Sequence, residues 1–167
     1  HIAAMAALFP AITFELYDPR AFDAKLVEGP RMHLHRQYFT DDDAKRWANR
    51  ADVFFMSDIR TTGPKPAEAR ALAELQARGT PYSEREVEAL ARDIIEAEVA
   101  ENMAAQQRWV LIMQPAEALL KFRLPYVYGD KDEKPYRYLK GLVVYQVWEG
   151  ATSTETRLVP VREDGHL

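Results

Sequence analysis

The chain has 167 residues, 47% of them hydrophobic and 29% charged, which is typical of one globular domain with a substantial core. It contains no cysteine, and this excludes disulfides, thiolate zinc sites and a cysteine nucleophile. The net charge of −4 disfavours nucleic-acid binding through bulk positive charge, and no apolar run approaches the roughly 20 residues of a membrane span. We therefore expect a single domain over residues 1–167 with no membrane partner.

The first part of the chain alternates between helix and strand patterns. Strands are indicated where apolar and polar residues alternate or where apolar residues run together, and helices where a hydroxyl residue precedes acids. These patterns predict a helix over 1–9, strands over 11–17 and 31–36, a helix over 40–50 and a strand over 52–58. Because Val53 to Met56 are all apolar, we expect the last strand to be buried on both faces.

The second part begins with two helices and ends with a pair of strands. Gly79 is a typical helix end, and Ser83-Glu-Arg-Glu86 is a capping box that starts a long helix. The patterns predict helices over 67–78 and 83–107, a buried strand over 109–113, a polar loop over 125–138 and strands over 139–148 and 155–161. The last two strands have the pattern of an antiparallel hairpin, so the element order predicts a mostly parallel α/β sheet with an antiparallel edge.

Four charged residues near strand ends are candidates for chemistry, and each has a structural alternative. Asp18 and Asp58 follow strands at the end where open α/β sheets bind ligands, but Asp18 could instead be a turn residue and Asp58 a helix-capping or loop carboxylate. Lys121, between two apolar residues, is either partly desolvated or extends from an apolar surface to solvent. Glu155 starts the last strand, where a solvent-facing position is favoured. The histidines show no metal-ligand spacing with acids, and no Gly-rich phosphate loop is present, so we expect no metal site.

Three segments together resemble a known family. They are Ser57-Asp-Ile-Arg60, Leu119-Leu-Lys-Phe-Arg-Leu-Pro125 and Ser153-Thr-Glu-Thr-Arg-Leu158. In order, strand context and approximate spacing they resemble the poxvirus cap-specific mRNA (nucleoside-2′-O)-methyltransferase, which is also the small subunit of the viral poly(A) polymerase. Asp18-Pro-Arg20 is similar to an Asp-Gly-Arg segment of that family. The resemblance implies a Rossmann-like methyltransferase fold, mostly parallel with an antiparallel C-terminal hairpin, in a protein of a large DNA virus.

The resemblance also implies an activity, which is methyl transfer from S-adenosylmethionine to the ribose 2′-hydroxyl of the first transcribed nucleotide of capped mRNA. Of the family's catalytic Lys-Asp-Lys-Glu tetrad, Asp58, Lys121 and Glu155 carry over. His1-Ile2 resembles the residues just after the family's Gly-rich cofactor loop, so we expect the first strand, that loop and the first lysine to lie upstream. The segment 63–82 is longer than the family leads us to expect.

The resemblance distributes further contacts among charged and aromatic residues. It assigns the cofactor to Asp18, Arg20, Arg36, Tyr38 and Asp58, and the RNA to Arg60, Arg123, Tyr126 and Lys131. Residues 121–140 hold six basic and three acidic side chains with interleaved tyrosines, which form either an RNA-binding patch or a solvated loop with tyrosines packed inward. The implied partners are capped mRNA and the catalytic subunit of a viral poly(A) polymerase, in the host cytoplasm or the virion.

Two other functions stay open at this stage. One is a non-catalytic processivity or scaffold subunit of the polymerase, and the other is a methyltransferase for another RNA position or a small molecule. The retained acid, lysine and glutamate favour the enzyme, because a scaffold has no need of them.

Since the cofactor loop is expected upstream of residue 1, we predict that the isolated 167-residue chain binds S-adenosylmethionine weakly. Titration calorimetry checks this expectation, and tight binding by the isolated chain would contradict it.

Overall fold

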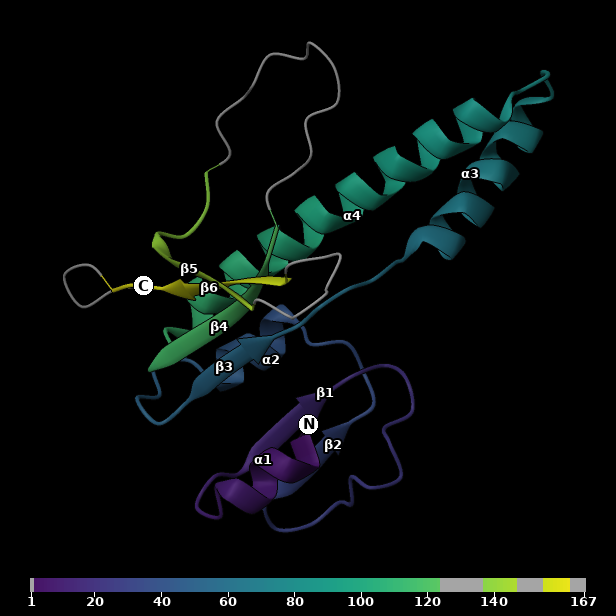
Figure 1. The fold of residues 1–167 in the computed structure, drawn as a ribbon. Helices are drawn as coiled ribbons and strands as arrows, with labels where there is room; N and C mark the ends of the chain where they lie inside the picture. The colour runs from purple at the N-terminus through teal and green to yellow at the C-terminus, as the bar shows by residue number, and fades with distance from the viewer. Residues whose placement is uncertain (1, 124–136, 147–154, 163–167) are drawn as a thin grey trace. The chain divides into compact units, whose positions relative to one another are not determined.

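The computed structural model describes residues 2–123, 137–146 and 155–162 of the chain (Figure 1). The chain forms two compact units, His1–Ala44 and Lys45–Leu167, and each contains its own β-sheet. The fold is mixed α/β, with one parallel pair of strands and one mixed sheet of four strands. The order of element types matches the prediction, although the strand expected over 109–113 is replaced by one over 117–122.

The first unit is built around two short parallel strands. Helix α1 (Ile2–Leu8) precedes strand β1 (Phe14–Tyr17), which pairs with strand β2 (Met32–His35) so that Glu15 lies opposite His33. Both predicted strands are therefore confirmed, with the first shorter at its start. Helix α2 (Asp41–Arg46) begins after Thr40, whose hydroxyl accepts from the Asp43 backbone N–H at 3.2 Å, and it ends earlier than the predicted residue 50.

The second unit has a four-stranded sheet that ends in a hairpin. Its strands are β3 (Phe54–Ser57), β4 (Glu117–Phe122), β5 (Gly141–Gln146) and β6 (Glu155–Pro160). The order is β3-β4-β6-β5, in which β3 and β4 are parallel and β6 is antiparallel to both of its neighbours. The predicted antiparallel pairing of the last two strands is confirmed. Because β6 lies between β4 and β5, its side chains become direct neighbours of those on β4.

Two-sided burial of β3 was a wrong prediction. Phe54 and Met56 are 56% and 45% exposed, whereas Phe55 packs against the core and Ser57 is buried. Exposure alternates along β3 because α4 packs against only one face of the sheet. No described element of this unit covers the other face over Phe54 and Met56. A short apolar run does not reveal how many faces of a strand are covered.

The predicted strand over 109–113 is also wrong, because these residues form the last turns of a helix. Helix α4 runs from Glu84 to Met113, 30 residues and about 45 Å long. Its buried residues Met103, Gln106, Val110 and Met113 recur at helical spacing, so the apolar run at its end belongs to one stripe. The strand follows at β4, and Lys121 therefore lies within a strand and not just past one.

The long segment after β3 is mostly helical. Helix α3 (Pro64–Arg78) starts earlier than predicted, with proline in its first turn, and ends at Gly79, whose φ of 69° is left-handed. Figure 1 shows α3 lying along the N-terminal part of α4. Ala67, Ala71 and Ala91 are buried between them, and small side chains allow the two helices to approach closely. None of the described helices is long and apolar enough to cross a membrane.

The C-terminal part of α4 packs on the sheet and fixes the position of β4. Val110 of the helix forms a buried cluster with Ala118 and Leu120 of β4 and Leu158 of β6. Lys121 directly follows Leu120, so this cluster sets where the lysine backbone lies.

We predict that Leu120→Ala lowers the free energy of unfolding by about 2–5 kcal/mol, because a fully buried leucine leaves a cavity when truncated. Leu111→Ala is the matched control, since Leu111 is 47% exposed, and it should cost less than about 1 kcal/mol. Urea denaturation measures both, and equal losses would contradict the described core.

Candidate functional site

One carboxylate and two cations converge at the end of β3. Asp58 directly follows that strand, and its Oδ1 accepts from Lys121 Nζ at 2.7 Å and pairs with Arg157 Nη2 at 3.2 Å. The three side chains come from segments far apart in the sequence. The structure brings the candidates Asp58 and Lys121 together, and it puts Asp58 in the loop after β3.

The register of the sheet explains this convergence. Lys121 and Arg157 are direct partners across the antiparallel β4–β6 pair, so their side chains leave the same face of the sheet. Ser57 pairs with Leu120, which puts Asp58 one step beyond the strand end and level with Lys121. Two cations placed side by side repel each other, and a shared carboxylate offsets that repulsion.

The exposure of the three residues differs in a way that matters for chemistry. Asp58 is 62% exposed, while the Lys121 and Arg157 side chains are only 21% exposed. Both cations bind Oδ1, and no described residue donates a hydrogen bond to Asp58 Oδ2. The acid thus keeps one oxygen that can accept a hydrogen bond from a ligand.

Some predicted site residues lie at the limits of what the structure describes. Glu155 is the first residue of β6 and its backbone pairs with Gln146, two positions before Arg157, but its side chain lies outside the described part. Tyr126 and Lys131 fall in 124–136, also outside the described residues. Their roles stay predictions.

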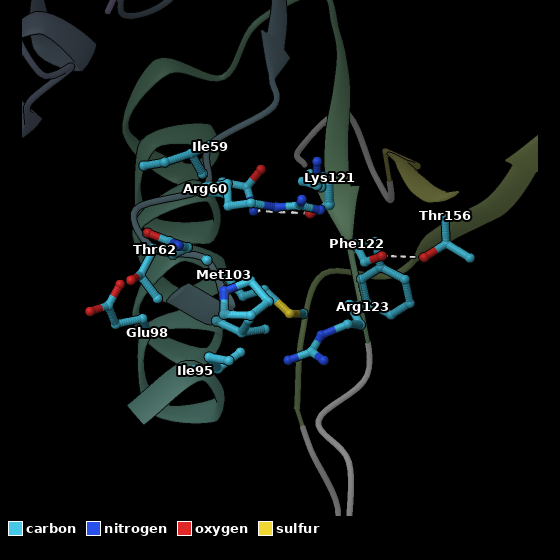
Figure 2. Close-up of a pocket in the computed structure, with 15 residues that line it drawn as sticks. Ile59, Arg60, Thr62, Ile95, Glu98, Met103, Lys121, Phe122, Arg123 and Thr156 are labelled. Carbon is cyan, nitrogen blue, oxygen red and sulfur yellow. Dashed lines mark hydrogen bonds between the residues drawn. The ribbon is translucent and has the colours of Figure 1, made fainter. Parts of the chain in front are cut away.

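A pocket of about 260 Å³ adjoins the lysine (Figure 2). Its walls are the segment after β3, the middle of α4 and the end of β4, and Figure 2 shows Ile95 and Met103 of the helix facing Phe122 of the strand. Arg60 and Arg123, both predicted to bind RNA, line it. Arg123 pairs with Glu96 of α4 at 2.8 Å.

The floor of this pocket includes a buried amide. Gln106 of α4 is 1% exposed, and its Nε2 donates to the backbone carbonyl of Lys121 at 3.0 Å. This hydrogen bond connects α4 to β4 at Lys121.

The predicted cofactor residues Asp18, Arg20, Arg36 and Tyr38 belong to the first unit. Asp18 follows β1 and accepts from the Arg20 backbone N–H at 2.8 Å and from its guanidinium at 3.1 and 3.2 Å. The Arg20 guanidinium holds the pKa of the Asp18 carboxyl below its usual 3.8. The local hydrogen bonds from Arg20 fit the turn alternative for Asp18, and the guanidinium keeps the acid ionised. Arg36 and Tyr38 are exposed.

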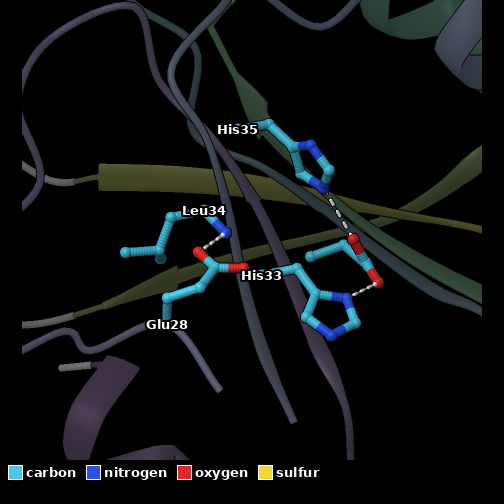
Figure 3. Close-up of polar contacts among 5 residues, drawn as sticks. Glu28, His33, Leu34 and His35 are labelled. Carbon is cyan, nitrogen blue, oxygen red and sulfur yellow. Dashed lines mark hydrogen bonds and ion pairs between the residues drawn. The ribbon is translucent and has the colours of Figure 1, made fainter. Parts of the chain in front are cut away.

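A second polar group lies on β1 and β2. The two carboxylate oxygens of Glu15 bond His33 Nδ1 at 2.6 Å and His35 Nε2 at 2.7 Å, and Figure 3 shows both rings directed to one carboxylate. The ring of Tyr17 stacks on His35 at 4.3 Å. Within the described residues, no group of three or more histidine or acidic side chains is arranged to hold a metal.

A scan against protein-family models finds no match to this chain, and no curated protein matches it significantly. The interpretation of the site therefore depends on its geometry.

Sequence reasoning missed two residues of the site, Arg157 and Gln106. Arg157 stands two positions after Glu155 in the segment that was singled out, so strand alternation could have placed it beside the lysine. No sequence signal marks Gln106, since the predicted helix ended next to it. The residue is buried because α4 continues to Met113 and packs on the sheet.

We predict a pH dependence from Glu15. Burial raises its pKa, but the hydrogen bonds and charges of His35 and His33 outweigh this and leave the pKa below the ordinary 4.5. The ionised carboxylate therefore stabilises the fold above the unfolded-state value, and this contribution is lost as the pH falls through the folded-state value. The loss of stability caused by Glu15→Gln should accordingly be larger at about pH 6 than at about pH 3.

Unfolding free energies of the wild type and variant at the two pH values test this. Glu68→Gln, at an exposed helical position, is the control and should show no such difference. An effect of Glu15→Gln that does not change with pH would contradict the prediction.

Proposed function

We propose that this chain is an S-adenosylmethionine-dependent methyltransferase that modifies the ribose 2′-hydroxyl of the first transcribed nucleotide of capped mRNA. The observation that carries the proposal is the 2.7 Å contact between Lys121 and Asp58 at the ends of adjacent parallel strands. Ligands bind at this end of the strands in open α/β sheets, and the two residues are the acid and lysine that the family resemblance selects.

The sheet of the second unit supports a Rossmann-like methyltransferase fold. A parallel pair, β3 and β4, is followed by an antiparallel hairpin, β5 and β6, as the resemblance implies. Helix α4 covers one face of that sheet, and the candidate residues gather at the carboxyl ends of the parallel strands, with Asp58 just past β3 and Lys121 near the end of β4. We propose that these four strands form part of a larger, doubly wound sheet.

The reaction is an in-line displacement at a sulfonium methyl group, so the oxygen, methyl and sulfur must be aligned. The attacking hydroxyl is weak until its proton is removed, and Lys121 in its neutral form is the proposed general base. Asp58 orients the lysine through its 2.7 Å contact with Nζ, and Arg157 binds the same carboxylate oxygen at 3.2 Å.

Asp58 also suits a contact with the cofactor. The oxygen that takes no hydrogen bond from described residues can accept from the amino group of S-adenosylmethionine, while the other oxygen holds the two cations. The resemblance assigns the cofactor ribose to Asp18 of the first unit, with Arg20, Arg36 and Tyr38, and this assignment stays a prediction. S-adenosylmethionine supplies the electrophilic methyl group, and the residues of this chain bind and orient it.

The test is Lys121→Met in the natural full-length protein. Methionine keeps the apolar stem and removes the amine, so methyl transfer to capped RNA should fall by about 10²-fold or more, the usual contribution of a general base. Transfer of a labelled methyl group, followed over a range of pH, measures the effect. Lys65→Met, at an exposed position on α3, is the control and should leave the rate unchanged.

A normal rate for Lys121→Met at every pH would refute the assignment of the base. If the wild-type protein transferred no methyl group but increased the processivity of a poly(A) polymerase, the scaffold alternative would replace the enzyme.

A further inference from the structure

Gln106 carries a hydrogen-bond acceptor that the described protein leaves unused. Its side chain is 1% exposed, and its Oε1 has no hydrogen-bond partner among the described residues. The amide orientation is determined by the other end, because Nε2 donates to the Lys121 carbonyl at 3.0 Å and an oxygen in its place could not. A buried acceptor of this kind is unfavourable unless a donor reaches it.

The pocket lined by Gln106 has the character of a site for a flat, mostly apolar ring. Its walls include the apolar side chains of Ile95, Val99, Met103 and Phe122, as Figure 2 shows for three of these residues. The volume of about 260 Å³ lies just below the usual range for pockets that hold a small molecule. Apolar walls with one buried polar group are typical of sites where shape binds a ligand and a single hydrogen bond orients it.

The rim of the same pocket is cationic. Arg60 lines it, and no described residue forms an ion pair with Arg60. Lys121 also lines it, with its ammonium held at Asp58. On the opposite wall, Glu98 is occupied by Arg70 and by the Thr61 hydroxyl, so its negative charge is already neutralised within the protein. The exposed guanidinium of Arg60 suits a phosphate.

We propose that this pocket takes one base of the RNA substrate, with a base N–H donating to Gln106 Oε1 and the attached phosphate binding Arg60. The proposal rests on the proposed function and names where the acceptor strand is held. Gln106 would be a positioning residue, since its Nε2 fixes the Lys121 backbone while its Oε1 holds the nucleotide beside it.

The chemistry predicts a site that accepts any of the four bases. Each base presents at least one N–H to a lone acceptor, and one of the two Nε2 hydrogens is already used by the Lys121 carbonyl. The site therefore detects that a base is present and does not read its identity.

The test uses uridine monophosphate, whose base has a single N–H donor, at N3. Binding to the wild-type full-length protein is followed by the NMR shift of the Gln106 side-chain amide. Methylation at N3 removes the donor and leaves Oε1 unpaired, so affinity should fall about tenfold or more. Methylation at C5 adds a methyl group but keeps the donor, and it should change the affinity much less.

Equal affinities for the N3-methyl and C5-methyl ligands, or no saturable shift with uridine monophosphate, would overturn the proposal and assign Gln106 Oε1 to bound water only. Gln106→Met provides a second test, because a variant of similar volume should bind the two methylated ligands equally. The ligand comparison needs only the wild-type protein and no methyl transfer. Its failure is therefore distinguishable from failure of the proposed function, which the rate of Lys121→Met tests separately.

Discussion

The packing of α4 against β4 is the interaction on which the second unit depends. The first half of this helix contacts α3 through small side chains, and its second half supplies Val110 to the cluster that holds Leu120 and Leu158. In this second half, Gln106 also bonds the backbone of Lys121. The helix thus forms one wall of the pocket and also determines the position of the lysine. The candidate site is a consequence of core packing and not of an independent loop.

The charges around Lys121 are arranged by the strand register and by Asp58. The antiparallel register puts Lys121 and Arg157 side by side, which is unfavourable for two cations unless an anion joins them. Asp58 supplies that anion from the neighbouring parallel strand. Because the acid is well exposed, the ion pairs contribute little to stability in water. The arrangement aligns a lysine, an acid and a pocket, as the proposed function requires.

The parts of the fold that could be predicted depended on local signals. The capping box at Ser83, the left-handed Gly79 and the alternation before Asp18 each report the conformation of a few neighbouring residues, and these elements are confirmed. The exposure of Phe54 and the helical state of residues 109–113 could not be predicted. A run of apolar residues fits a buried strand and a buried helix equally well until its neighbours in space are known.

The sequence by itself identified Asp58, Lys121 and Glu155 as candidate site residues, and it predicted that Asp58 directly follows a strand. Only the tertiary structure decided that Lys121 belongs to the adjacent strand, that Arg157 shares the same carboxylate oxygen, and that Gln106 is buried with an acceptor to spare. The physical reason is that these contacts depend on strand register and on the length of α4 across the sheet. Both are set by long-range packing, which no local pattern encodes.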